Sequence, residues 1–292
     1  MSTAAKLRAN AKVNLSLDVT GIRDDGYHIV DMVNCSVTLF DELEIVMMPG
    51  ESFSISSNVR YLPTDERNLI WKAAKRLSDK TGIPMPEAKV TVRKRIPSQA
   101  GLGGGSADAA AALIGFNLLL GLGLTKDELS VIGASVGADV PFCISGGTAR
   151  VGGIGEVITP LRDELSYPIL IAMPRYGHST KEAYAMLDRV PEIHHPDIGS
   201  VITGLCEGDA DKAFSRAGNV FEDVFSDEVT LELKRKMTAD GALYSAMTGT
   251  GAAVFGIFPR AREALEARDL LRAEGYGAWV TYRADRGVET VN

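Results

Sequence analysis

Glycines are concentrated between Gly101 and Gly105, where four of five residues are glycine and Ser106 follows. A loop of this composition lets backbone N–H groups approach a ligand without obstruction by side chains. If a helix begins directly after the loop, its positive N-terminal end is directed at the same point, and both features favour a phosphate group. The Ser106 hydroxyl could then add a ligand for phosphate or magnesium. The segment is therefore a candidate phosphate site.

The residues on either side of the loop fit this interpretation. Residues 89–95 alternate between apolar and polar side chains, which predicts a strand. The alanine-rich run that ends at Leu120 predicts a buried helix. Two familiar phosphate loops do not match, because no lysine follows the last glycine and Ser106 stands where a GxGxxG motif needs glycine. A flexible turn that permits close packing is the alternative, and the order strand, loop, helix favours phosphate.

Two further segments carry side chains that could do chemistry. Residues 7–20 alternate regularly, which predicts a half-buried strand with Lys12 and Asn14 on its polar face. Their side chains point to the same side, although this face could simply meet solvent. Asp139 lies among small and apolar residues just beyond a predicted helix, where the helix dipole disfavours a negative charge. An ordinary turn-forming aspartate is the alternative there.

The charge and hydrophobicity of the chain argue against some classes of binding partner. The 292 residues carry 31 basic and 38 acidic side chains, and no stretch gathers the Lys/Arg stripe that a nucleic acid would need. No run of 18 or more apolar residues is present, so we expect no membrane span and a cytoplasmic location. The three cysteines are widely spaced and predict reduced structural thiols. We expect a monomer or a weak homodimer.

The remaining pattern predicts an α+β protein in which the arrangement of strands and helices changes near residue 160. A turn at residues 23–26 separates the first strand from strands at 33–39 and 43–47. Asn68 is expected to cap a helix that ends before Gly82, and Thr125 to begin a helix that runs to about Val136. The later elements are a strand at 168–173, helices near 181–187, 229–237 and 260–272, a glycine turn at 248–251 and a strand at 278–282. We therefore predict domains over 1–160 and 161–292.

The loop and the later glycine turn together resemble motifs of the GHMP kinases, the superfamily of galactokinase, homoserine kinase and mevalonate kinase. The resemblance implies two domains, an N-terminal ATP-binding and catalytic one that is ribosomal protein S5 domain 2-like and a ferredoxin-like C-terminal one. It also implies ATP and Mg²⁺ as cofactors. The family commonly has a second hydroxyl residue directly after the serine of the glycine loop, and this chain has Ala107 at that position. The implied ATP-binding residues are Pro97, Ser98, Gln99, Ala100, Gly101, Leu102, Gly103, Gly104, Gly105, Ser106 and Ala107, with Thr248, Gly249, Thr250 and Gly251 as the second glycine turn.

The same resemblance implies roles for the polar strand and the aspartate. Asp139 in Gly-Ala-Asp-Val-Pro would accept the substrate proton, and Lys12 would pair with it and stabilise the developing alkoxide. Ala-Lys-Val-Asn-Leu at 11–15, followed by Asp-Gly-Tyr-His at 25–28, resembles one branch of the superfamily. That branch phosphorylates the 2-hydroxyl of a small-molecule, cytidine-diphosphate-linked alcohol for non-mevalonate isoprenoid synthesis. The implied substrate-binding residues are Asn14, Tyr27, His28 and Tyr184.

Other interpretations stay open at this point. A GHMP kinase could act on another small alcohol, of the homoserine or mevalonate type, but those acceptors offer no base on which Tyr27 could stack. A non-catalytic ligand sensor could keep the glycine loop, but the presence of both Lys12 and Asp139 favours an enzyme. Tyr184 could be a core residue of a helix. The pair at 194–195, two histidines before Pro196, is expected to be a polar loop and not a metal site.

Overall fold

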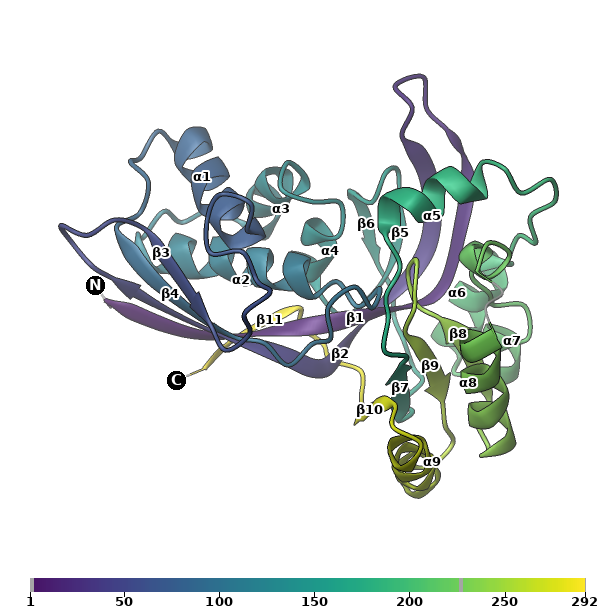
Figure 1. The fold of residues 1–292 in the computed structure, drawn as a ribbon. Helices are drawn as coiled ribbons and strands as arrows, with labels where there is room; N and C mark the ends of the chain where they lie inside the picture. The colour runs from purple at the N-terminus through teal and green to yellow at the C-terminus, as the bar shows by residue number, and fades with distance from the viewer. Residues whose placement is uncertain (1–2, 226–227, 292) are drawn as a thin grey trace.

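A computed structural model of the chain describes residues 3–225 and 228–291. Within these residues the strands form a seven-stranded and a four-stranded sheet (Figure 1). The first sheet contains β1 (Ala4–Ile22), β2 (His28–Met47), β3 (Ser54–Ser57), β4 (Ala88–Arg93), β5 (Thr148–Gly152), β6 (Val157–Pro160) and β11 (Val288–Val291). The second contains β7 (Ile169–Met173), β8 (Tyr244–Met247), β9 (Val254–Ile257) and β10 (Gly277–Thr281).

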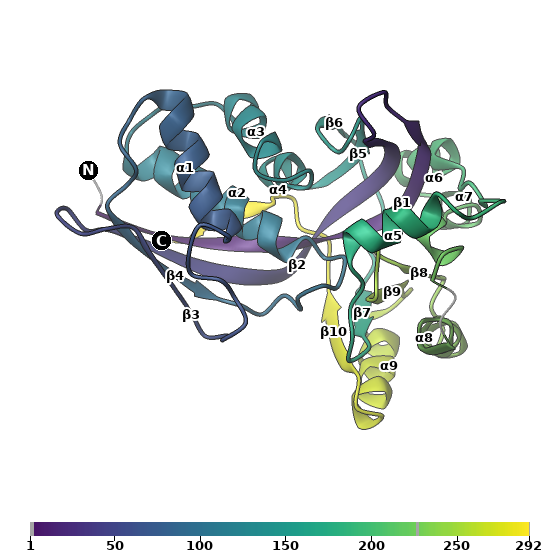
Figure 2. The ribbon, with the colours of Figure 1, turned by 45° about the horizontal axis from the view of Figure 1, so that its top comes forward.

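Helices cover one face of the first sheet and flank the second (Figures 1 and 2). The first group is α1 (Leu69–Thr81), α2 (Gly104–Leu119), α3 (Lys126–Ala134) and α4 (Val140–Ser145). The later helices are α5 (Thr180–Leu187), α6 (Ile198–Glu207), α7 (Ala210–Phe214), the 3-10 helix η1 (Val220–Glu222), α8 (Glu228–Ala239) and α9 (Ala261–Ala273). No helix in the described segments is long and apolar enough to cross a membrane.

Helix α2 lies at the centre of the first core and confirms the helix predicted from the alanine-rich run. Its alanines from Ala109 to Ala112, with Leu113 and Phe116, are completely buried between α1 and the sheet. Small side chains allow the helix to approach β1 closely. A Cβ at Gly115 would lie 2.6 Å from Ile45 Cδ1 and 3.0 Å from Leu7 Cδ1. The position of the helix start relative to β1 is therefore fixed by close packing.

Strands β1 and β2 form one long antiparallel hairpin that runs through both halves of the molecule (Figure 1). The predicted turn at 23–26 is confirmed, with the Gly26 N–H donating to Arg23 O at 2.9 Å. The prediction of separate strands at 33–39 and 43–47 was wrong, because β2 is continuous. A bulge explains the error, since Asn10 pairs with Phe40 but Ala11 already pairs with Val37.

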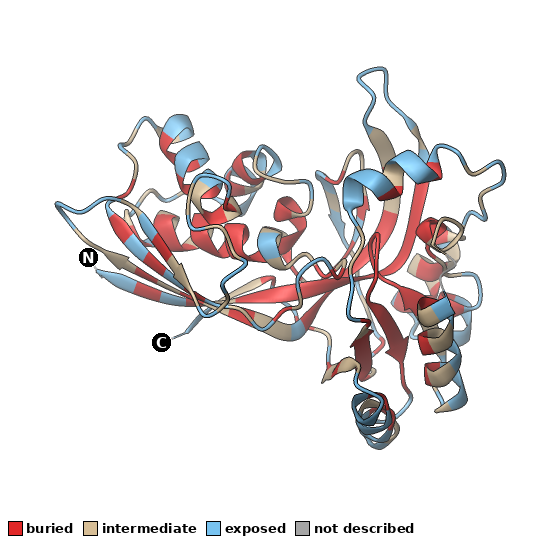
Figure 3. Cartoon of the chain, in the orientation of Figure 1, coloured by how far each residue is buried: buried red, intermediate tan, exposed pale blue. Residues whose placement is uncertain are grey.

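The polar face of β1 is covered along its middle, from Asn10 to Asp18, so the prediction of a half-buried strand was wrong there. Asn10, Lys12, Asn14, Ser16 and Asp18 are all at most 6% exposed, and Figure 3 shows the middle of β1 as buried. Segments from far along the chain cover this face, including the glycine loop, residues near 218 and the loop at 194–195. Polar side chains buried in this way need partners. They are the framework of the site described below.

Predictions made from local signals are confirmed at the helix ends. Asn68 caps α1 by accepting from Ile70 N–H at 2.9 Å, and Gly82 ends that helix with a φ of +73°. Thr125 and Glu128 form a capping box at the start of α3, which ends at Ala134. The pair at 194–195 lies in a loop, where each histidine ring contacts an aspartate.

In the second half, β7, β10, α5, α8 and α9 confirm the predicted elements. No prediction covered β8 and β9, which flank the second glycine turn, or the short helices α6 and α7. The last strand, β11, returns to pair with β1, so it lies in the first sheet. The boundary near residue 160 stays a prediction, and residues 1–2, 226–227 and 292 of the two ranges lie outside the described residues. Cys35 and Cys143 are buried thiols and Cys206 is exposed.

Candidate active site

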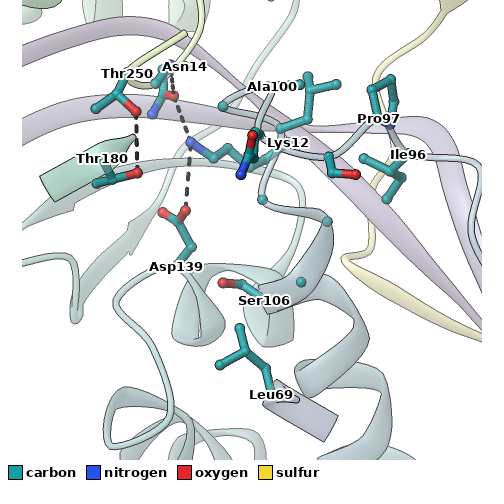
Figure 4. Close-up of a pocket in the computed structure, with 18 of the residues that line it drawn as sticks. Lys12, Asn14, Leu69, Ile96, Pro97, Ala100, Ser106, Asp139, Thr180 and Thr250 are labelled. Atoms are coloured by element: carbon teal, nitrogen blue, oxygen red, sulfur yellow. Dashed lines mark hydrogen bonds and ion pairs between the residues drawn. The ribbon is translucent and has the colours of Figure 1, made fainter. Parts of the chain in front are cut away.

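A cavity of about 420 Å³ lies where the glycine loop, β1, α4 and the second glycine turn meet (Figure 4). Every predicted residue from Pro97 to Ser106 lines it, and so do Lys12, Asn14, Asp139 and Tyr184. Gly249 and Thr250 of the second turn complete one wall. Ala107 is completely buried and does not line the cavity. The structure thus brings most of the predicted site residues, from five separate segments, to one place.

The glycine loop ends as the first turn of α2, as the order strand, loop, helix predicted. Gly103 is the N-terminal cap residue, with a φ of +67°, and α2 begins at Gly104. Because Gly103 has no side chain, the first N–H groups of α2 receive no side-chain cap and stay available to a ligand. Gly104, Gly105 and Ser106 all line the cavity. The positive end of the helix dipole is therefore directed at the cavity, which suits phosphate.

The second glycine turn packs directly on the first. A Cβ at Gly101 would lie 1.9 Å from the backbone oxygen of Thr248, and one at Gly249 would lie 3.0 Å from Gly101 Cα. Two backbones can approach this closely only where side chains are absent. The two turns therefore form a single unit. Thr250 Oγ1 of the second turn also lies 3.3 Å from Thr180 Oγ1, at the start of α5.

Lys12, Asn14 and Asp139 form a charged group opposite the helix start (Figure 4). Lys12 Nζ donates to Asn14 Oδ1 at 2.7 Å and lies 3.8 Å from Asp139 Oδ2. Asn14 Oδ1 also accepts from the Gly249 N–H at 2.8 Å, and its Nδ2 donates to Asn34 Oδ1 at 2.6 Å. The Lys12 side chain is 5% exposed and that of Asp139 is 32% exposed. Asn14 thus fixes the ammonium group, while the carboxylate stays accessible from the cavity.

The position of Asp139 corrects the prediction that it lies in the unfavourable field of a helix C-terminus. Helix α3 ends at Ala134, and Asp139 is the N-terminal cap residue of α4, which sequence analysis missed. Pro141 follows in the first turn, a position where proline fits because no N–H is needed. The dipole of α4 therefore favours the negative charge of Asp139.

The predicted base-binding residues are only partly assembled. The His28 and Tyr184 rings lie 4.6 Å apart, and Tyr184 meets the ring of Phe221 edge-on at 4.9 Å. His28 Nε2 is 2.7 Å from Asp188 Oδ1. Burial, aided by the charge of Asp139, raises the pKa of Tyr184 to about 12, so its hydroxyl stays protonated. Tyr27 is 60% exposed and is not among the described residues that line the cavity.

Several lining residues were not predicted from the sequence. The wall beside the start of α2 is built by Tyr61, Leu62, Pro63 and Leu69, and Lys94 lies at its base. A lysine directly before a glycine loop is a signal that could have been noticed. Phe221 and Thr180 carry no local signal, because their segments reach the cavity only through the folding of the second half.

Comparison with known proteins agrees with this geometry. The family model described as the GHMP kinases N terminal domain matches residues 68–147, and that described as GHMP kinases C terminal matches residues 227–277. A 4-diphosphocytidyl-2-C-methyl-D-erythritol kinase from Lachnospira eligens is 40% identical over 92% of this chain and 94% of its own length. One from Bacillus cytotoxicus is 41% identical over 86% of this chain and 87% of its own length.

Solved structures show the same relationship. The crystal structure of a 4-(cytidine 5'-diphospho)-2C-methyl-D-erythritol kinase superposes with a TM-score of 0.79 at 28% identity, covering 96% of this chain and 99% of that one. A homoserine kinase from Cytophaga hutchinsonii reaches 0.80 at 19% identity, covering 100% and 98%, and so shares the fold. From the sequence identity and the shared fold, the chain belongs to the GHMP kinase family.

Proposed function

We propose that this chain transfers the γ-phosphoryl group of ATP to the 2-hydroxyl of 4-diphosphocytidyl-2-C-methyl-D-erythritol, a step of non-mevalonate isoprenoid synthesis. The observation that carries the proposal is the Lys12–Asp139 pair, which faces the open N-terminus of α2 across one cavity. Relatives of that name, 38–41% identical over most of the chain, support the choice of acceptor.

The geometry is suited to direct transfer. With the phosphates held on the N–H groups of Gly103 to Ser106, an acceptor hydroxyl lying between the γ-phosphorus and Asp139 gives its proton to that carboxylate. The hydroxyl oxygen forms the new bond to phosphorus, and the bond from phosphorus to the β–γ bridging oxygen breaks, so ADP leaves. Lys12, oriented by Asn14, stabilises the negative charge on the transferring group and the alkoxide.

Magnesium fits this site as a companion of the nucleotide. Within the described residues no group of three His, Cys, Asp or Glu side chains could hold a metal alone. Mg²⁺ commonly takes one or two protein oxygens together with substrate phosphates and water. The Ser106 hydroxyl is an oxygen donor that lines the cavity. A bound Mg²⁺ would supply neutralisation of the phosphate charge.

The acceptor is tested by measuring ADP release, with a coupled assay, from ATP and each of three alcohols. We expect turnover with the cytidine-diphosphate-linked substrate and none above background with homoserine or mevalonate. Turnover with only homoserine or only mevalonate would show that the chain is a kinase with a different acceptor. If no ADP appeared with any of them, the sensor interpretation would be favoured.

Replacing Tyr184 should weaken acceptor binding and leave nucleotide binding unchanged. Stacking on an aromatic ring contributes about 1–3 kcal/mol per base, so Tyr184→Ala should raise KM for the cytidine substrate about 10- to 100-fold. KM for ATP should stay within about twofold. Tyr282→Ala, at an exposed tyrosine that does not line the cavity, is the control. An equal rise in both KM values would show that Tyr184 supports the fold and does not bind the base.

The remaining expectations rest on the sequence. A cytoplasmic location, a monomer or weak homodimer, and the lack of a nucleic acid partner stay predictions. The roles of Tyr27 and His28 also stay predictions, and Tyr27 is exposed and lies outside the lining of the cavity.

A further inference from the structure

Three buried charged side chains meet beneath the glycine loop. Lys94, which directly follows β4, contacts Asp41 Oδ2 of β2 and lies 2.6 Å from Asp108 Oδ2 of α2. The side chains of Lys94, Asp41 and Asp108 are 6%, 0% and 3% exposed. The cluster therefore joins the sheet, the start of the loop and the helix that follows it. Neither the transfer step nor the acceptor contacts described above use it.

The cluster holds both ends of the loop. Asp41 Oδ1 accepts from the backbone N–H groups of Arg95 at 2.5 Å and Ile96 at 2.8 Å, where the chain leaves β4. At the other end, Lys94 Nζ lies 3.4 Å from the backbone oxygen of Gly104, the first residue of α2. Lys94 also lines the cavity beside the helix start. A shift of this lysine would therefore move the N–H groups that face the phosphates.

The charges in the cluster are not balanced. With all three groups ionised, two carboxylates face one ammonium, and Asp108 Oδ1 has no hydrogen-bond partner in the described part of the chain. Burial raises the pKa of Asp108 to about 7. The charge of Lys94 acts to lower this pKa, and the charge of Asp41 acts to raise it. Burial lowers the pKa of Lys94, but Asp108 and Asp41 more than offset this and leave it raised.

Such a cluster adds little to stability. Apolar side chains of similar size commonly support a fold as well as a buried ion pair does, because desolvation offsets the attraction. What the ion pair adds is a defined orientation of the groups that it joins, since a lysine between two carboxylates has one favourable place. At this location the oriented groups are the ends of the phosphate loop.

We propose that Asp108 and Asp41, acting through Lys94, are positioning residues that hold the first turn of α2 in the orientation that binds the nucleotide phosphates. The inference rests on the proposed function for the identity of the ligand, a nucleoside triphosphate or diphosphate. The orientation of the first turn of α2 by the cluster is tested separately from the identity of that ligand. Loss of the cluster affects nucleotide affinity more than acceptor affinity, because the cluster touches the glycine loop and none of the predicted base-binding side chains.

The test compares Asp108→Asn with Asp163→Asn in the full chain. Asp163 is also a buried aspartate, 3.7 Å from Arg283, but it does not line the cavity. Loss of one hydrogen bond to a charged phosphate weakens binding at least about tenfold, so we expect Asp108→Asn to raise the Kd for ADP and the KM for ATP by at least about that factor. KM for the acceptor should stay within about twofold. Asp163→Asn should leave all three constants unchanged, even where its unfolding midpoint in urea falls.

A second variant separates positioning from folding. Lys94→Met and Asp108→Leu, combined with Asp41→Asn, remove all three charges of the cluster together. Asp41→Asn keeps an oxygen that can accept from the Arg95 and Ile96 N–H groups. We expect this triple variant to keep its urea midpoint within the range of the wild type and still bind ADP about tenfold more weakly. ADP affinity equal to that of the wild type in the folded variants would overturn the inference. ADP binding by calorimetry needs no acceptor, so this outcome is distinct from failure of the proposed reaction.

Discussion

Replacing Lys12 by methionine or Asp139 by asparagine should each lower kcat about 10³-fold. Proton transfer by a positioned side chain contributes roughly 10²–10⁴-fold, and a buried cation at the developing charge contributes a similar factor. The two charges lie 3.8 Å apart and act on the same oxygen, so we expect them to behave as one unit. The double variant should therefore be no slower than the slower single variant, because effects within one catalytic unit are not additive.

Turnover at saturating substrates, measured together with ADP affinity, checks this prediction. ADP affinity should change less than about threefold, since the phosphates are held by backbone N–H groups and not by these side chains. The matched controls are Asp31→Asn and Arg150→Met, which break a 2.7 Å ion pair outside the cavity lining. If the losses of Lys12→Met and Asp139→Asn multiplied in the double variant, the two residues would act in separate steps.

The proposed catalytic pair, Lys12 and Asp139, depends on a polar strand that the fold buries. Lys12 and Asn14 lie on the face of β1 that the glycine loop and the second glycine turn cover, and the Lys12 N–H donates to Leu102 O at 3.1 Å. The strand, the loop and the turn therefore cannot shift independently. This arrangement preorganises the positive charge before substrates bind, which lowers the reorganisation needed in the transition state.

Elements with local signals were predictable from the sequence. The Thr125 capping box, the Asn68 cap and the alanine-rich helix α2 follow from residues within a few positions of one another. The same holds for the glycine loop, because its glycines, its serine and the following helix are contiguous. Family resemblance then added the partner residues of the site.

Features that depend on distant segments were not predictable. Alternation along β1 cannot distinguish a solvated polar face from one covered by residues 100–103 and by the loops near 195 and 218, because the covering segments are far away in sequence. The pairing of β11 with β1 is equally remote. Asp139 looked unfavourably placed because α4 is only six residues long and too short to show a hydrophobic period.

Replacing Gly101 by alanine should weaken nucleotide binding strongly, because the two glycine turns could no longer touch. Its Cβ would lie 1.9 Å from Thr248 O, a backbone atom that cannot rotate away, and its φ is +73°. The left-handed conformation alone costs roughly 1–2 kcal/mol, and separating the turns adds the loss of their packing. Gly82→Ala is the control, since Gly82 has the same φ of +73° and nothing within 4 Å of the new Cβ. Gly82→Ala should lose about 1–2 kcal/mol in urea unfolding from strain alone, and Gly101→Ala should lose more than this. Only Gly101→Ala should weaken ADP binding, by at least about 10²-fold. Equal ADP affinity in the two variants would mean that the loop binds phosphate without its contact to the second turn.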